Sequence, residues 1–138
     1  MPSQKFSRKY IARHRKSAQL WKRATKLSPG GVESNIRFFR PHPFFADYGD
    51  GGYIYDVDGN KILDFMMGFG ALFLGHNNRD IALELIKQLE SGSMMGITTE
   101  LFPEYIQQIQ KAMPCMKKVR LANRGTEATM HAMRVARA

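Results

Sequence analysis

Two stretches of the sequence place apolar residues with the period of an α-helix. In residues 78–90, apolar side chains recur at helical spacing and the charged side chains fall between them. A second apolar stripe runs over residues 98–113, with Thr98 and Thr99 as predicted caps and Pro103 in the first turn, where a missing N–H costs little. Both stretches therefore predict amphipathic helices whose apolar faces pack against a core.

Residues 53–65 have the pattern of a β-hairpin. Apolar and aromatic side chains form two arms, and Asp58-Gly59 lies between them. This dipeptide is a turn signal because glycine adopts a positive φ without steric cost. The preceding residues 32–52 combine prolines and glycines with frequent phenylalanines. Such aromatic side chains need packing partners, so we expect an ordered, extended segment there.

The segment after the hairpin, residues 66–75, is rich in glycine and large apolar residues and predicts a buried, irregular connection. His76 follows it and has no second histidine at metal-ligand spacing. Asp56, Asp58 and Asn60 alternate as calcium ligands do, but the glycine and the glutamate that a calcium loop needs at its sixth and twelfth positions are missing. We therefore expect no metal site.

The last predicted strand and helix are joined by a turn that is able to bind phosphate. Residues 118–122 predict the strand, residues 127–138 predict the helix, and Arg124, Gly125 and Thr126 lie between them. The first N–H groups of a helix lack partners and carry partial positive charge. Gly125 allows close approach of an oxygen, and Thr126 offers an N–H and a hydroxyl. Many such turns bind nothing, so the pattern alone leaves both interpretations open.

The positive charge of the chain is concentrated at its N-terminus. Lys and Arg number 21 against 12 Asp and Glu, and nine of the basic residues precede the first acidic residue, Glu33. Residues 1–27 form this basic segment, which has a moderate helical pattern. Three interpretations stay open: a helix that leads into the domain, a transit peptide, or a segment that binds nucleic acid or another anionic surface.

The composition excludes several classes of protein. With 43% apolar and 24% charged residues in 138, the chain is globular rather than disordered or collagen-like. A single cysteine, Cys115, forms no intrachain disulfide and favours a reducing, cytoplasmic location. No apolar run approaches the roughly 20 residues that cross a membrane.

Four motifs in the expected order resemble those of one enzyme family. They are PGGVESNIR at residues 29–37, GYIYDVDGN at residues 52–60 followed by Asp64, LGH at residues 74–76, and VRLANRGTEA at residues 119–128. On these motifs, residues 20–138 resemble the class-III aminotransferases, and most closely the glutamate-1-semialdehyde 2,1-aminomutases. Several separate motifs at family spacing are more specific than any one of them.

The resemblance implies a fold, a cofactor and a division of the chain. The fold is α/β, the N-terminal part of a pyridoxal-phosphate-dependent transferase of fold type I (aspartate-aminotransferase-like), with an incomplete sheet. Residues 1–27 are then the basic helical segment, residues 28–75 belong to the small domain, and residues 76–138 begin the large cofactor-binding domain. The implied cofactor is pyridoxal 5′-phosphate, the substrate a small amino acid or semialdehyde, and the assembly a homodimer, without nucleic-acid or membrane partners.

The resemblance also assigns residues to the site. Gly125 and Thr126 match the phosphate-binding turn of the family. Arg37 matches the arginine that meets the substrate carboxylate, with Ser34 beside it, and the fork of an arginine pairs both carboxylate oxygens. A surface ion pair is the alternative for Arg37. Arg124 stands where the family usually has a serine, and it either pairs with phosphate or obstructs it.

The resemblance finally implies that part of the family's catalytic machinery lies outside these 138 residues. The family is about three times as long, as expected of a multi-domain enzyme, and its Schiff-base lysine lies downstream. The helical pattern is still running at Ala138 without a C-cap, which indicates a truncated chain. We therefore assign no catalytic residue and expect the isolated chain to be inactive. The alternatives are a non-catalytic remnant that pairs with a full-length homologue and, less favoured, a basic nucleic-acid-binding module.

Overall fold

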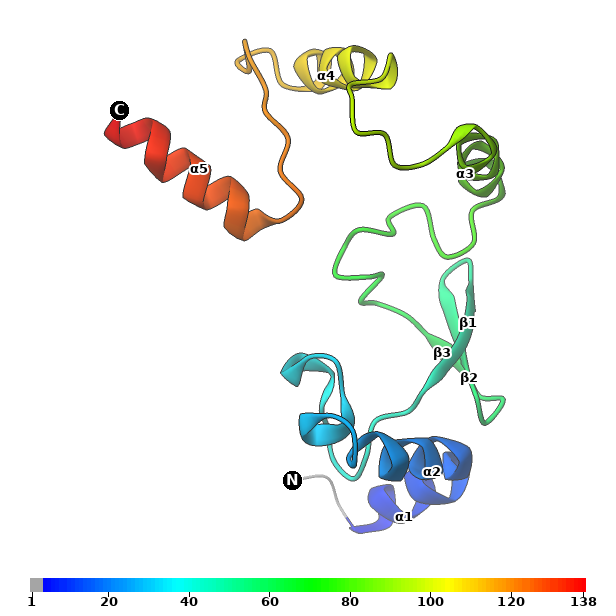
Figure 1. Cartoon of the computed structure of the whole chain (residues 1–138). Coiled ribbons are helices and arrows are strands. Elements are labelled where there is room, and N and C mark those ends of the chain that lie inside the picture. The colour runs from blue at the N-terminus through cyan, green and yellow to red at the C-terminus, as the bar shows by residue number, and fades with distance from the viewer. Residues whose placement is uncertain (1–3) are drawn as a thin grey trace. The chain divides into compact units, whose positions relative to one another are not determined.

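The computed structural model describes residues 4–138, with side chains from Phe6 onward. The chain divides into two compact units, Met1–Ser91 and Gly92–Ala138, and each is described by itself. The first unit holds three α-helices and a three-stranded antiparallel sheet, and the second holds two α-helices (Figure 1). The domain boundaries predicted at residues 28 and 76 stay predictions, and residues 1–3 of the predicted basic segment lie outside the described residues.

The basic N-terminal segment forms two helices, α1 (Gln4–Arg13) and α2 (Arg15–Ala24). They are separated at His14, whose φ of −124° and ψ of 51° are not helical. The ring Nδ1 of His14 lies 2.8 Å from the carbonyl oxygen of Tyr10, and its Nε2 lies 3.2 Å from the carboxylate of the buried Asp56. The helical segment is therefore interrupted at the residue that contacts the sheet.

The sheet contains β1 (Ala46–Asp50), β2 (Tyr53–Asp56) and β3 (Lys61–Leu63) in that order. Strands β2 and β3 confirm the predicted hairpin, and Gly59 in its loop has a φ of +83°. The sequence predicted only an extended segment where β1 lies, because its Asp and Gly residues mask the strand pattern. Tyr48 of β1 stacks on Tyr55 of β2, with ring centroids 4.5 Å apart.

Aromatic rings fill the space between the two N-terminal helices and the segment before β1. Tyr10 lies edge-on to Phe39, with ring centroids 6.0 Å apart, and 5.2 Å from the ring of the buried His42. Phe39 and Phe44 are also 6.0 Å apart. Burial here raises the pKa of Tyr10 to about 12, with smaller contributions from Asp56 and Asp58. The predicted ordering of this aromatic segment is thus confirmed.

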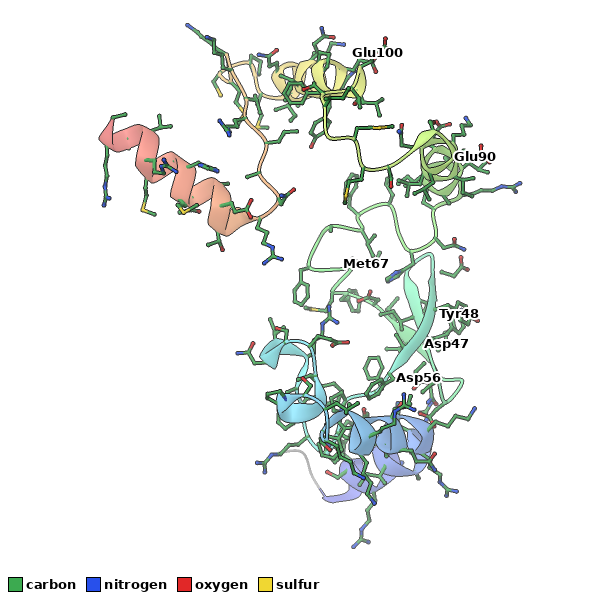
Figure 2. All side chains as sticks on the ribbon, viewed as in Figure 1. Asp47, Tyr48, Asp56, Met67, Glu90 and Glu100 are labelled. Carbon is green, nitrogen blue, oxygen red and sulfur yellow. The ribbon has the colours of Figure 1, made fainter. Side chains whose placement is uncertain are left out.

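A carboxylate of the β2–β3 loop attaches α2 to the sheet. Asp58 accepts hydrogen bonds from the backbone N–H of Lys16 at 2.6 Å, the backbone N–H of Ser17 at 2.9 Å and the Ser17 hydroxyl at 2.7 Å. Ser17 is fully buried, and its hydroxyl oxygen accepts the N–H of Phe45 at 3.1 Å. Figure 2 shows Asp56 at the same end of the sheet, next to α2. Asp58 therefore supplies, from a distant loop, the anionic cap that the first turn of α2 lacks in its own sequence.

Acid is expected to release this cap. Burial alone raises the pKa of Asp58, but the hydrogen bonds from Ser17 and Lys16 outweigh it and hold the pKa below its ordinary value of 3.8. A carboxylate with a lowered pKa stabilises the folded state while it is ionised, so the contribution is present above about pH 4 and lost as the pH falls through the folded-state pKa. Fluorescence of Trp21, the only tryptophan, should report this transition from within α2. The transition should be absent in Asp58→Asn, and an identical acid transition in that variant would contradict the assignment.

The helices α3 (Arg79–Ser91), α4 (Leu101–Ala112) and α5 (Gly125–Arg137) confirm the helical periodicity, but not the packing predicted from it. Their apolar faces are open: Leu89 of α3 is 62% exposed and Tyr105 of α4 is 55% exposed. Within residues 6–138, no apolar side chain belongs to a buried core. The core-facing orientation of these stripes therefore stays a prediction, and within the described residues the faces are open to solvent.

Two local predictions in the second unit are wrong. Residues 118–122 are not a strand, because a strand needs a hydrogen-bonded neighbour and none of the described strands pairs with them. Neither Thr98 nor Thr99 caps α4 through its side chain, since Glu100 occupies the cap position with helical backbone angles. Pro103 does lie in the first turn of α4, as predicted.

Candidate functional site

A pocket of about 730 Å³ lies within the first unit. Its wall comes from the 3₁₀ helices η1 (Pro29–Gly31) and η2 (Asn35–Arg37), the aromatic segment before β1, and the irregular segment after β3. Most of the lining side chains are apolar, and the charged or titratable ones are Glu33, Arg37, Asp64 and His76. The pocket thus combines a largely apolar wall with few polar groups, as small-molecule sites do.

Arg37, the predicted carboxylate-binding residue, borders this pocket at the end of η2. Its Nη1 lies 3.2 Å from the Glu33 carboxylate, and both side chains are more than half exposed. A backbone hydrogen bond within Glu33 is the main cause that holds the pKa of Glu33 below its ordinary value; burial opposes it, and the Arg37 guanidinium adds to the lowering. The surface ion pair that the sequence left open as the alternative is therefore present.

Ser34 occupies the position before η2 with extended backbone angles, and its side chain is exposed. The Ser34 hydroxyl lies 3.5 Å from the Asn35 side-chain oxygen, a distance too long for a strong hydrogen bond. Ser34 is not among the residues that line the pocket. The structure thus brings Arg37 to the pocket wall but does not bring Ser34 to it.

The pocket also contains a pair that sequence reasoning missed. The Nε2 of His76 lies 2.7 Å from Oδ2 of Asp64, and Oδ1 of Asp64 accepts the backbone N–H groups of Met66 and Met67 at 2.8 and 3.1 Å. The hydrogen bond from His76 is the main cause that holds the pKa of Asp64 below its ordinary value, and burial opposes it. Asp64 and His76 both lie in the matched motifs, but the spacing of His76 indicated only that it has no second histidine for a metal site.

The predicted phosphate-binding residues lie at the start of α5, in the second unit. Arg124 is the N-cap residue, with a φ of −144° and no side-chain capping bond, and Gly125 and Thr126 open the helix. In this part of the chain the N–H groups of Gly125, Thr126 and Glu127 donate to no protein acceptor. The Glu127 carboxylate turns back to accept the N–H of Asn123 at 3.1 Å. The helix start therefore offers free donors and an exposed threonine hydroxyl to an anion.

Two kinds of feature are absent from residues 4–138, the part of the chain that the structure describes. No group of three or more His, Cys, Asp or Glu side chains is arranged to hold a metal ion. No helix in the same residues is long and apolar enough to cross a membrane.

Comparison with known proteins gives consistent matches. The family model for class-III aminotransferases matches residues 38–138. The glutamate-1-semialdehyde 2,1-aminomutase of Archaeoglobus fulgidus is 49% identical over 122 residues, which are 88% of this chain and 29% of that protein. An omega-transaminase from Sphaerobacter thermophilus superimposes with a TM-score of 0.84 at 36% identity, over 88% of this chain and 28% of that one. A transaminase with PLP bound gives a TM-score of 0.85 at 30% identity, over 90% and 29%. The chain thus spans less than a third of the length of the proteins that it matches.

Proposed function

Since this chain belongs to the class-III aminotransferase family, with the fold of the type I transaminases, we propose that it contributes phosphate-binding and carboxylate-binding groups to a pyridoxal-phosphate-dependent aminotransferase or aminomutase. The proposal includes a small amino acid or semialdehyde as substrate, a homodimeric assembly and a cytoplasmic location. It assigns no catalytic residue to the chain, because none of its lysines stands in the family's Schiff-base motif.

The observation that carries the proposal is the free N-terminus of α5. Three consecutive N–H groups without protein acceptors and the positive end of the helix dipole suit a phosphate dianion. Thr126 adds a hydroxyl donor, and Gly125 has nothing within 4 Å of the place a Cβ would take, so an oxygen has room to approach. These residues fit the phosphate of pyridoxal phosphate, and Arg124 adds a cation at the cap position.

Arg37 is the proposed partner of the substrate carboxylate. Its guanidinium already pairs with one carboxylate, that of Glu33, in an exposed contact that contributes little to stability. An exposed partner of this kind is easily exchanged for the carboxylate of a ligand in the pocket. Ser34 stays a proposed neighbour of Arg37 in the same motif, and its side chain is exposed.

In this proposal the cofactor and the residues of the chain have separate roles. Bound pyridoxal phosphate supplies the electron sink that stabilises a carbanion next to the reacting nitrogen. The residues at the start of α5 hold and orient the phosphate, and Arg37 holds the substrate carboxylate at a fixed point. Each anchor reduces the orientations that the group it holds samples, and such orientation is a large part of catalysis.

Arg37→Ala tests the substrate role in an enzyme that contains this chain. Removing a charged, bidentate contact is expected to raise the KM for the amino-acid substrate about 10- to 100-fold, because hydrogen bonds to charged groups contribute roughly 1.5–3 kcal/mol. The affinity for pyridoxal phosphate, measured by absorbance, should stay near the wild-type value. Arg40→Ala, at an exposed arginine outside the pocket lining, is the matched control. Equal effects of the two variants would reject Arg37 as the carboxylate partner.

A further inference from the structure

We propose that Asp64 and His76 form a positioning pair that holds residues 65–75 in place as one wall of the pocket. The proposal concerns the shape of the pocket and goes beyond the assignment of Arg37 and the α5 helix start. It rests on how the two ends of this segment are attached, on the close packing around His76 and on the backbone of the segment itself.

Both ends of the segment are fixed to the turn between β1 and β2. The N–H of Asp64 donates to the carbonyl oxygen of Gly52 at 2.9 Å. At the other end, His76 and Gly51 exchange two backbone hydrogen bonds, of 2.8 and 3.0 Å. The side chains of Asp64 and His76 then join the two ends directly at 2.7 Å. The segment is therefore a loop that is closed at its base by side-chain as well as backbone contacts.

The position of the His76 ring is set by close packing. A Cβ added to Gly49 would lie 2.5 Å from Cγ of His76, which is well inside contact distance. The side chain of His76 is 18% exposed and that of Asp64 is 6% exposed. The ring therefore lies against bare backbone on one side and against a carboxylate at its edge, and it has little freedom to reorient.

The backbone between these ends needs such support. Met67 and Phe69 adopt positive φ values of 44° and 60°, which non-glycine residues rarely do unless their surroundings hold them there. Asp64 accepts the N–H groups of Met66 and Met67, so the carboxylate that pairs with His76 also orders the start of this strained turn. Figure 2 shows Met67 in this irregular connection.

The segment held by the pair supplies part of the pocket wall. Met66, Phe69 and Leu72 line the pocket together with Asp64 and His76. The N–H of Leu72 bonds the carbonyl oxygen of Met67 at 2.9 Å, so the ordered start of the segment fixes the residues that follow. His76 therefore acts on the pocket through Asp64 and this backbone, and it is a positioning residue rather than a catalytic one.

Hydrogen exchange in the whole chain tests the proposal. In His76→Ala, the amides of Met66, Met67 and Leu72 should exchange about 10- to 100-fold faster, because a hydrogen bond to a charged group is lost. Amides of the β2–β3 ladder should keep their wild-type rates. His76→Gln, whose side-chain amide still offers a donor toward Asp64, should restore most of the protection. Asp47→Ala, at an exposed carboxylate of β1, is the control and should change neither set.

Each outcome of the exchange measurement either supports or overturns the positioning role of the Asp64–His76 pair. Faster exchange confined to residues 66–72 and restored by glutamine supports the pair. Equal acceleration in the ladder, no acceleration in His76→Ala, or failure of glutamine to restore protection overturns it. The measurement needs neither cofactor nor substrate, so its failure is distinguishable from a failure of the Arg37→Ala test.

Discussion

Replacing Asp58 with alanine is expected to lower the free energy of unfolding of the N-terminal helices by about 2–3 kcal/mol, the size of a lost helix cap combined with lost charged hydrogen bonds. Three donors, two of them backbone N–H groups of α2, lose their acceptor in this variant. The Ser17 hydroxyl is left inside a fully buried site, where an unmade hydrogen bond is costly.

Urea titration followed by Trp21 fluorescence measures this effect at α2 itself. The Trp21 indole donates to the carbonyl oxygen of Gly30 at 3.0 Å, so its environment changes when α2 leaves its place. Asp50→Ala, at an exposed carboxylate of β1, is the matched control and should shift the midpoint little. A loss below about 0.5 kcal/mol for Asp58→Ala, the range of ordinary surface substitutions, would contradict the role of Asp58 as a cap.

Thr126→Ala is expected to weaken pyridoxal phosphate binding by about 10- to 100-fold in an enzyme that contains this chain. The variant removes one hydroxyl donor to a dianion while leaving the backbone N–H groups of α5 in place, and a charged hydrogen bond contributes roughly 1.5–3 kcal/mol. Titration followed by cofactor absorbance gives the dissociation constant. Thr129→Ala, whose hydroxyl bonds the carbonyl oxygen of Gly125 within α5, serves as a control for general damage to the helix. Equal losses in the two variants would argue against direct contact of Thr126 with the phosphate.

Arg124→Ser distinguishes the two roles open to Arg124. If the guanidinium pairs with the phosphate, the variant should bind the cofactor more weakly, and the loss should be larger at low salt, because salt screens the charge of the arginine. If the guanidinium obstructs the site, the variant should bind more tightly. The same titration at two ionic strengths separates these results. An unchanged affinity at both would show that Arg124 points away from the phosphate.

The sequence predicted those elements whose signal is local. Helices α3, α4 and α5 and the β2–β3 hairpin follow from periodicity and from one turn dipeptide. The strand expected at residues 118–122 has a local pattern too, but strand formation depends on a neighbour that sequence periodicity does not reveal. The division of the basic segment at His14 was missed because its cause lies in contacts with the distant residues Asp56 and Asp58.

The residues of the candidate site likewise fall into those that the sequence indicated and those that only the structure revealed. Resemblance indicated Arg37 and the turn at Gly125, because their motifs are contiguous in sequence. The Asp64–His76 pair joins residues 12 positions apart across an irregular segment, and no helical or strand period relates them. The sequence did contain a sign of this pair, because Asp64 and His76 each lie in one of two matched motifs. Only the structure shows that the segment between these motifs closes and brings the two side chains into contact.

The open apolar faces have a thermodynamic consequence. The heat-capacity change of unfolding grows with the apolar surface that unfolding exposes. Within the described residues, no apolar side chain is fully withdrawn from water, and Leu89 and Tyr105 remain more than half exposed. The isolated chain should therefore unfold with a small heat-capacity change for its length. Its free energy of unfolding should change with temperature with little curvature, and the apolar surface of its helices remains available for burial by whatever covers it.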